Sequence, residues 1–174
     1  MIRRATPADA PAIAAVQART WRHAYADIVE PEQMPSVADQ APRWVAHLDA
    51  GGAVHVWDQD GRVVGFATAG PGREDATAGE LYAIYVDPPA QGAGVGSALL
   101  AAAEQSLRDT GLGDGLLWTF EANGLARAFY ERHGWEADGR RREGLAPEVR
   151  YRKRLPPTTP GQGAEPPGGG IPRA

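Results

Sequence analysis

Several residue types and segments that common classes of protein depend on are missing from this sequence. It has no cysteine, which excludes disulfide bonds, Cys-ligated metals and a catalytic thiolate. The formal net charge of -4 and the pI of about 5.6 leave no basic footprint, so we expect no nucleic-acid partner. No stretch approaches the roughly 20 apolar residues of a membrane span, and no apolar segment follows the N-terminus. We therefore expect no membrane association and a cytoplasmic location.

Three motifs for nucleotide binding or hydrolysis are missing as well. A Walker loop requires Gly-Lys-Ser/Thr, and the only lysine of the chain is Lys153. A dinucleotide fingerprint counted from Gly92 and Gly94 needs a third glycine where Ser97 stands. A hydrolase would need a Gly-x-Ser-x-Gly elbow or a cysteine nucleophile. The four histidines do not have the spacing of metal ligands, so we expect no metal.

The residues that are present are typical of an ordinary folded domain. Hydrophobic residues make up 43% and charged residues 23% of the 174 positions, enough for one domain with a hydrophobic core. Hydrophobic periodicity predicts strands and helices in a mixed order. The expected strands cover residues 2–4, 53–57, 62–69, 80–86, 116–120, 135–137 and 149–154, and the expected helices cover residues 7–19, 38–48, 95–111 and 124–133. We expect a mixed α/β (α+β) domain over residues 1–155, followed by a Pro/Gly-rich, disordered tail over residues 156–174.

A glycine loop lies between the strand expected at residues 80–86 and the helix expected from residue 95. It reads Val86-Asp87-Pro88-Pro89-Ala90-Gln91-Gly92-Ala93-Gly94-Val95-Gly96-Ser97. Glycines let the backbone approach a ligand closely, and the free N–H groups at the start of a helix favour a phosphate. An ordinary turn is the alternative, but the position between a strand and an amphipathic helix favours an anion site.

Two sequence blocks resemble motifs of the GNAT superfamily of N-acetyltransferases. The first, Gln91-x-x-Gly94-x-Gly96, is similar to the Gln/Arg-x-x-Gly-x-Gly/Ala motif whose amides hold the pyrophosphate of coenzyme A. The second is similar to the family's Asn-x-x-Ala-x-x-Phe-Tyr-x-x-x-Gly-Phe segment and reads Asn123-x-x-Ala126-x-x-Phe129-Tyr130-Glu131-x-x-Gly134-Trp135. The resemblance covers the chain up to residue 155. It implies a GNAT-type fold, with a mostly antiparallel sheet of six or seven strands flanked by about four helices and splayed where strands 80–86 and 116–120 part.

The resemblance also implies acetyl-CoA as co-substrate and a set of positions that bind it. The backbone N–H of Ile84 is expected to face the thioester carbonyl, and the backbone of Val86 to pair with the pantetheine arm. Asn123 binds the pantetheine or caps the helix that begins beside it, and the two roles are compatible. The loop positions expected around the pyrophosphate are Gln91, Gly92, Gly94, Val95, Gly96 and Ser97.

Acetyl transfer to an amine requires a neutral nucleophile, stabilisation of the carbonyl oxygen and a proton for the leaving thiolate. The resemblance assigns the thiolate's proton to Tyr130, for which the alternative is a half-buried core tyrosine. It assigns the base to Glu80, acting directly or through water. The alternative for Glu80 is a solvated charge at the end of its strand.

We expect the chain to move the acetyl group of acetyl-CoA to a primary amine of a small molecule by direct attack in a ternary complex. Residues 21–35 and 139–147 are expected to wall the acceptor, with Trp21, Tyr25 and Asp27 as candidate contacts to a cationic amine. The alternative is that these aromatic residues only pack against the core and that the acidic residue only faces solvent. Acetylation of protein N-termini or lysines stays open, as does a non-catalytic acyl-CoA-binding sensor, although the presence of both Glu80 and Tyr130 disfavours the sensor. A homodimer is also open.

Overall fold

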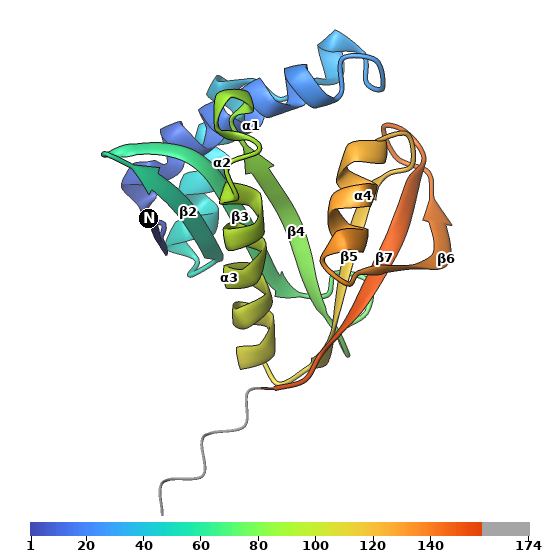
Figure 1. Ribbon diagram of the computed structural model, residues 1–174. Helices are drawn as coiled ribbons and strands as arrows, with labels where there is room; N and C mark the ends of the chain where they lie inside the picture. Colours follow the sequence, from blue (N-terminus) through green and yellow to red (C-terminus); the bar gives the residue numbers. More distant parts are fainter. Residues whose placement is uncertain (158–174) are drawn as a thin grey trace, which may run out of the picture.

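The computed structural model describes residues 1–157 and contains seven strands and four α-helices in that range (Figure 1). The strands are β1 (Ile2–Arg4), β2 (Ala53–Gln59), β3 (Arg62–Pro71), β4 (Gly79–Val86), β5 (Gly113–Phe120), β6 (Glu136–Arg142) and β7 (Glu148–Leu155). The helices are α1 (Ala10–Ala24), α2 (Val37–Asp49), α3 (Val95–Asp109) and α4 (Gly124–Arg132). The disordered tail expected over residues 156–174 lies, from residue 158 onward, outside the described residues.

All seven strands form one sheet in the order β1-β2-β3-β4-β5-β7-β6. Every neighbouring pair is antiparallel except β4 and β5, which run parallel. These two strands pair only over residues 79–81 and 115–117, and beyond that point they diverge (Figure 1). The structure therefore confirms the predicted GNAT-type fold, a mostly antiparallel sheet splayed at its centre.

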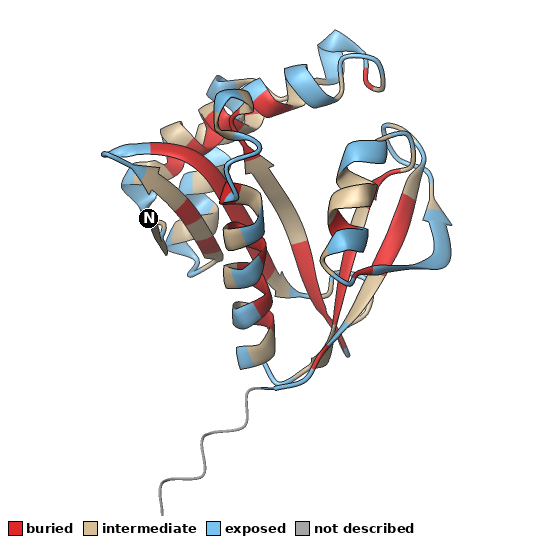
Figure 2. Ribbon diagram, in the orientation of Figure 1, coloured by how far each residue is buried: buried red, intermediate tan, exposed pale blue. Residues whose placement is uncertain are grey.

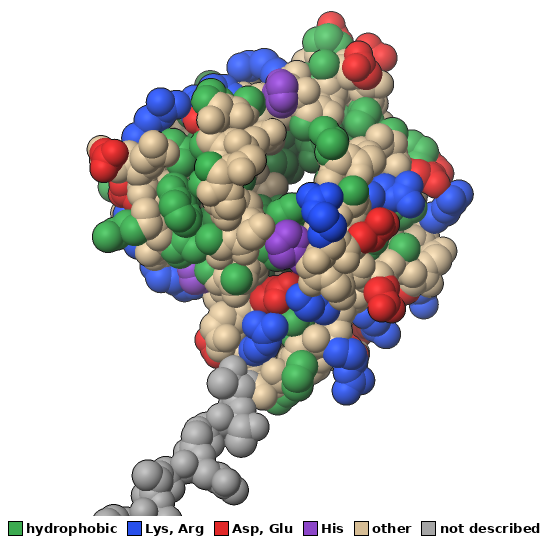
Figure 3. Space-filling model, viewed as in Figure 1, with side chains coloured by type: hydrophobic (Ala, Val, Ile, Leu, Met, Phe, Trp, Pro, Cys, Tyr) green, Lys and Arg blue, Asp and Glu red, His purple; other side chains and the backbone are tan. Residues whose placement is uncertain are grey.

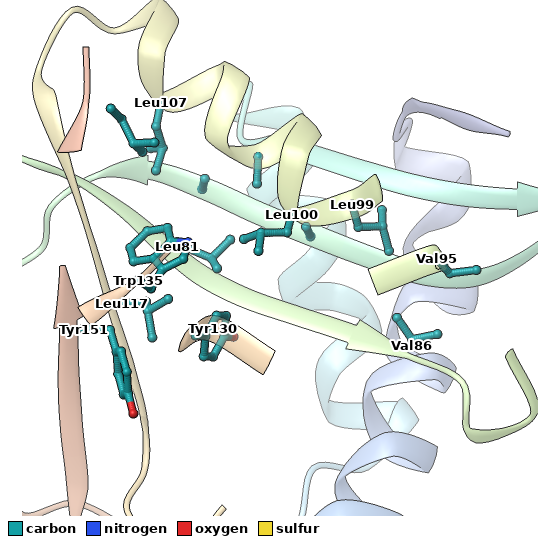
Figure 4. Packing of buried hydrophobic residues seen from close by; sticks show 14 of the residues in the cluster. Leu81, Val86, Val95, Leu99, Leu100, Leu107, Leu117, Tyr130, Trp135 and Tyr151 are labelled. Carbon is teal, nitrogen blue, oxygen red and sulfur yellow. The ribbon is translucent and has the colours of Figure 1, made fainter. Parts of the chain in front are cut away.

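Helices cover both faces of the sheet and make two hydrophobic cores. On one face, α3 and α4 pack onto the strands, and Leu99 and Tyr130 share a core with Leu117 of β5 (Figure 4). On the other face, α1 and α2 lie over β2 and β3, where Ile13 packs with Phe66. Burial is concentrated along the central strands and on the sheet-facing sides of α1 and α3 (Figure 2). The α3/α4 core contains residues of both halves of the splayed sheet, such as Leu81 of β4 and Leu117 of β5, and so holds the two halves together.

α1 and β6 each continue five residues beyond their predicted ends. α1 continues beyond residue 19 to Ala24, after a short 3-10 turn in which Asp9 accepts a hydrogen bond from the Thr6 N–H at 2.8 Å. β6 covers Glu136–Arg142 instead of residues 135–137. It is an edge strand whose side chains are almost all exposed, so its sequence has no apolar alternation from which a strand could be predicted.

A buried carboxylate ties α3 to the half of the molecule that contains α4 and β7. Glu104 of α3 is 6% exposed, and its Oε1 accepts hydrogen bonds from Trp135 Nε1 at 3.0 Å and from Lys153 Nζ at 2.7 Å. Lys153 also donates to the carbonyl of His133 at 2.7 Å. The carboxylate therefore joins α3 to the half that contains α4 and β7, at the end of the sheet where β4 and β5 still pair.

We expect Glu104→Ala to lower the free energy of unfolding by about 3 kcal/mol, because it leaves the Trp135 N–H without an acceptor and the Lys153 ammonium without its carboxylate partner. Urea unfolding measures this change. Glu136→Ala is the matched control, since it removes an exposed glutamate and should change stability by less than about 0.5 kcal/mol. If the two variants lose similar stability, the bonds of Glu104 do not hold the two halves together.

Candidate functional site

A cleft of about 870 Å³ lies where β4 and β5 part. Its walls come from β4 and the glycine loop on one side, and from β5, α4 and the beginning of β7 on the other. The space-filling view shows the molecule hollowed between α3 and α4 (Figure 3). Residues at the end of α1 and in the β6–β7 loop complete the lining. Because β4 and β5 do not pair with each other here, the cleft is reached from both faces of the sheet.

A bulge in β4 marks the point where the strand leaves β5. Ala83 pairs with Thr68 of β3, whereas Leu81 pairs with the next residue, Ala69. Tyr82 is therefore the extra residue, and it lines the cleft. The bulge reverses the alternation of side chains, so that Leu81 and Ile84 pack in the same core.

Beyond the bulge, the edge of β4 presents backbone groups to the cleft. Asp87 N donates to Val64 O of β3 at 2.8 Å, which fixes the direction of the Asp87 N–H. Backbone groups of successive strand residues point to opposite neighbours, so those of Ile84 and Val86 point toward β5. Since β5 does not pair there, we infer that Ile84 offers its N–H and C=O to the cleft and that Val86 offers its N–H, because the Val86 carbonyl already accepts from Gln91 and Thr20.

The glycine loop enters α3 through two residues in the left-handed region. Gly92 has φ 79° and Gly94 has φ 80°, and Gly94 is the N-cap of α3. The first N–H groups of the helix follow directly and have no acceptor within it. The Gln91 side chain is bonded to β4 and not to the start of α3. Its Nε2 donates to the Val86 carbonyl at 2.9 Å, which ties the loop back to β4.

Two further contacts hold the loop in place. Asp87, which precedes it, is 1% exposed and accepts hydrogen bonds from Arg19 of α1 at 2.6 and 2.7 Å. On the far side, the Ser97 hydroxyl lies 3.0 Å from His133 Nε2, at the end of α4. The Gly96 position, inside the first turn of α3, leaves its Cβ site 3.5 Å from the Phe129 ring. The loop is thus braced against α1, β4 and α4.

α4 brings a cap and a phenol to the cleft. Asn123 is the N-cap, and its Oδ1 accepts from the Ala126 N–H at 3.1 Å. The capping role considered for Asn123 is therefore present, and the residue also lines the cleft. Tyr130 is 8% exposed and lines the same cleft. Burial, and after it the nearby Tyr25, raises the pKa of Tyr130, so its phenol keeps its proton at neutral pH.

Aromatic side chains form the wall on the face of the sheet that α1 and α2 cover. Trp21, Tyr25 and Phe120 pack edge to face, with ring centroids 4.9 to 6.1 Å apart. Burial raises the pKa of Tyr25 and of Tyr85, which also line the cleft. The Trp21 indole Nε1 is buried and has no hydrogen-bond partner among the described residues.

The charged wall on this face differs from the one expected for a cationic amine. Asp27 is exposed and does not line the cleft, and the other acids of residues 21–35 do not line it either. Arginines line it instead, Arg73 and Arg142 on this face and Arg132 at the end of α4, and Glu148 is the only carboxylate among its described lining residues. Arg142 lies over the Trp118 ring at 4.3 Å and donates from Nε to Glu148 at 2.5 Å.

Glu80 is not where a base for the acceptor amine was expected. It is 3% exposed, lies outside the cleft lining, and pairs with Leu116 where β4 and β5 still run together. Its Oε2 accepts from the Arg73 backbone N–H at 2.8 Å, and its Oε1 accepts from Arg73 Nε at 3.0 Å and from Nη2. The alternative of a solvated charge is wrong, because the carboxylate is buried, and its bonds position Arg73 at the cleft.

Most of the expected site residues are brought together by the structure. Those that line the cleft are Trp21, Tyr25, Ile84, Val86, Gln91, Gly92, Gly94, Gly96, Ser97, Asn123 and Tyr130. Those that do not are Asp27, Glu80 and Val95, of which Val95 is a core residue at 4% exposure. The lining residues that the sequence did not single out include Arg73, Tyr82, Tyr85, Trp118, Phe120, Arg142 and Glu148. Alternation along strand 116–120 could have identified Trp118 and Phe120, since Leu117, which precedes them, belongs to the core.

Comparison with known proteins gives one family. A model described as "Acetyltransferase (GNAT) family" matches residues 14–135. The Mycobacterium tuberculosis protein "Probable N-acetyltransferase Rv2775" is 30% identical over 146 residues, which are 80% of this chain and 81% of that protein. A mycothiol acetyltransferase of Salinispora tropica is 39% identical over 117 residues, which are 64% of this chain but only 38% of that longer protein.

Solved structures share the fold. The ribosomal-protein-alanine N-acetyltransferase of Brucella melitensis superposes with a TM-score of 0.73 at 25% identity, over 89% of this chain and 99% of that one. The PaiA N-acetyltransferase of Thermoplasma acidophilum, solved with coenzyme A, has a TM-score of 0.72 at 18% identity, over 88% and 98% of the two chains. A Salmonella typhimurium acetyltransferase homologue solved with acetyl-CoA has a TM-score of 0.72 at 19% identity, over 94% and 98%.

Membrane-spanning helices and metal-ligand clusters are both absent from residues 1–157. No helix in that range has the length and apolar character needed to cross a membrane. In the same range, no cluster of three or more His, Cys, Asp or Glu side chains could hold a metal ion.

Proposed function

The chain belongs to the GNAT family of acetyltransferases and is an acetyl-CoA-dependent N-acetyltransferase, and on this premise we propose that it acetylates a primary amine of a small molecule by direct attack in a ternary complex. The observation that carries the proposal is that one cleft is open to both faces of the sheet. The glycine loop and Tyr130 lie on the α3/α4 side, and the aromatic wall lies on the α1/α2 side. Two substrates can then meet through the gap between β4 and β5.

The residues on the α3/α4 side fit acetyl-CoA. The N–H groups that follow Gly94 are suited to the pyrophosphate, because they begin a 15-residue helix and no side chain at Gly92 or Gly94 covers them. The unpaired edge of β4 at Val86 can add the amide-rich pantetheine arm as a strand would be added. Solved relatives hold coenzyme A or acetyl-CoA, which supports this assignment.

Two groups are suited to the charges that change during transfer. The Ile84 N–H can donate to the thioester carbonyl oxygen as negative charge develops on it. Tyr130 can donate its phenolic proton to the departing thiolate as the C–S bond breaks, because burial keeps that phenol protonated at neutral pH, and the proton that the amine loses on forming the C–N bond restores the phenol. We assign no covalent intermediate, since the chain has no cysteine and the two substrates can meet directly.

A small-molecule acceptor is supported by the relatives named mycothiol acetyltransferase, although this chain covers only 38% of the length of the one from Salinispora tropica. The test is an acetyl-CoA consumption assay over amino acids, polyamines, aminoglycosides and peptides, with the products identified by mass spectrometry. We expect acetylation of a small amine. Efficient acetylation of peptides alone would instead support a protein acetyltransferase, and tight coenzyme binding without any product would support a sensor.

The surroundings of Glu80 lead to a prediction that separates a structural role from a catalytic one. We expect Glu80→Gln to lower the free energy of unfolding by about 1 to 2 kcal/mol, because Arg73 loses a charged partner. The acidic limb of the pH profile of kcat should stay where it is, since the carboxylate does not reach the cleft. Urea unfolding and a pH-rate series measure both effects. Loss of the acidic limb in a stable variant would restore Glu80 as the base.

A further inference from the structure

We propose that the acceptor is an amine with a carboxylate beside its amino group, as in an amino acid, and that Arg142 and Glu148 bind its two charges. This inference rests on the proposed function and names the class of its second substrate. It starts from the composition of the cleft on the α1/α2 side, where the opposite charges of one ion pair stand next to each other.

Alternation along β7 places Glu148 on the acceptor side of the sheet. Val149 and Tyr151 belong to the α3/α4 core, so Glu148 points to the opposite face. Its Cα pairs with Phe120 of β5, whose ring packs against Tyr25 at 4.9 Å. Glu148 is 19% exposed at its side chain, and only its Oε2 has a hydrogen-bond partner among the described residues. The free oxygen is suited to an ammonium group.

Arg142 presents the opposite charge beside it. Its Nε donates to Glu148 at 2.5 Å and its Nη1 donates to Glu74 at 2.6 Å, while Nη2 has no partner within residues 1–157. The guanidinium carbon lies over the Trp118 ring, 4.3 Å from the ring centroid. A planar guanidinium with a fixed orientation binds carboxylates well, because its N–H groups match the carboxylate geometry.

A second arginine reaches the same cleft from the opposite wall. Arg73 lies over the Tyr82 ring at 4.9 Å, and its hydrogen bonds to Glu80 use Nε and Nη2 and leave Nη1 without a partner among the described residues. Glu80 is buried outside the cleft, so the charge that this pair presents to the cleft is the cation. Glu74, the neighbour of Arg73, pairs with Arg142 across the gap. The two arginines therefore border one space.

The hydrogen-bonding groups at this wall favour a zwitterion over a plain cationic amine. A zwitterion offers its carboxylate to the free guanidinium N–H groups and its ammonium to Glu148, whereas a plain amine leaves those N–H groups without an acceptor. Binding of both charges also orients the amino group, since the covalent structure of the acceptor fixes the distance between its carboxylate and its ammonium.

The test compares amino acids with their α-amides and with the amines that lack the carboxyl group. For the best acceptor, we expect kcat/KM to fall at least tenfold in both derivatives, as for the loss of a charge-assisted hydrogen bond. Amidation lowers the pKa of the neighbouring amine and so makes it a more available nucleophile, which means that a preference for the acid cannot come from basicity. Amides or simple amines acetylated as efficiently as the acids would overturn the inference. Absence of acetylation in every class would instead overturn the proposed function.

Variants assign the preference to the named residues. Arg142→Gln and Arg73→Gln should each raise KM about tenfold for the acid and leave KM for the amide unchanged. Glu148→Gln should raise KM for acid and amide together, because both carry the ammonium. Arg141→Gln is the matched control, since Arg141 is 70% exposed, pairs with Glu121 and does not line the cleft. If a folded Arg142→Gln protein and a folded Arg73→Gln protein both keep the wild-type ratio of acid to amide, the carboxylate is bound elsewhere.

Discussion

Replacing Tyr130 by phenylalanine should lower kcat by roughly 10²-fold while the affinity for acetyl-CoA stays unchanged. The change removes one hydroxyl and keeps the ring that packs against Trp135 and Tyr151, so folding should survive. Burial raises the pKa of this phenol, and a general acid works at pH values below its own pKa. The wild-type rate should therefore show no loss from Tyr130 ionisation between pH 6 and about 10, the ordinary pKa of a tyrosine.

Tyr151→Phe is the control for this prediction. It removes a phenol from the neighbouring ring, which donates to Glu131 at 2.7 Å and accepts from Arg127 at 3.2 Å but does not line the cleft. We expect it to cost stability and to leave kcat near the wild-type value. Steady-state kinetics and isothermal titration with coenzyme A measure both variants. Equal kcat values for Tyr130→Phe and the wild type would remove the phenol from the mechanism.

Replacing Gly94 by valine should weaken coenzyme binding by roughly 10²-fold, which corresponds to the loss of one or two charge-assisted hydrogen bonds to phosphate. Gly94 has φ 80°, a conformation that a β-branched residue adopts only with strain, so the first turn of α3 should shift. The Cβ position itself meets no atom within 4 Å, so the effect comes from the backbone and not from a clash within the protein.

Gly139→Val separates the binding defect from general strain. Gly139 has φ 81°, also has no atom within 4 Å of its Cβ position, and lies in β6 outside the cleft. Both variants should lose about 1 to 3 kcal/mol of stability, but only Gly94→Val should lose affinity for coenzyme A in isothermal titration. Unchanged affinity in a folded Gly94→Val protein would mean that the pyrophosphate is not held by this loop.

The coenzyme side of the cleft could be predicted from the sequence because its signals are local. A strand end, two glycines and a helix start follow each other within residues 86–97, and Asn123 and Tyr130 belong to one short helix. Residues so close in sequence are positioned by turn chemistry and helical spacing, which the sequence expresses directly.

The acceptor side could not be predicted in the same way because its residues meet through non-local pairing. Arg142 ends an edge strand, and it reaches Glu148 and Trp118 only because β7 lies between β6 and β5 in the sheet. The environment of Glu80 depends on Arg73, which lies in a loop without hydrophobic periodicity. Strand order and loop conformation are decided by the packing of the whole domain, which no short window of sequence contains.

We propose that acetyl transfer occurs directly between two substrates in the cleft. The measurement that tests it most directly is a quenched turnover with isotopically labelled acetyl-CoA and an amine acceptor, followed by mass spectrometry of the acceptor and of the intact protein. We predict that the label appears in the amide of the acceptor, that one molecule of free coenzyme A forms for each amide, and that the protein mass stays unchanged. Label that accumulates on the protein and later moves to the acceptor, or release of coenzyme A without an acetylated acceptor, would contradict the claim.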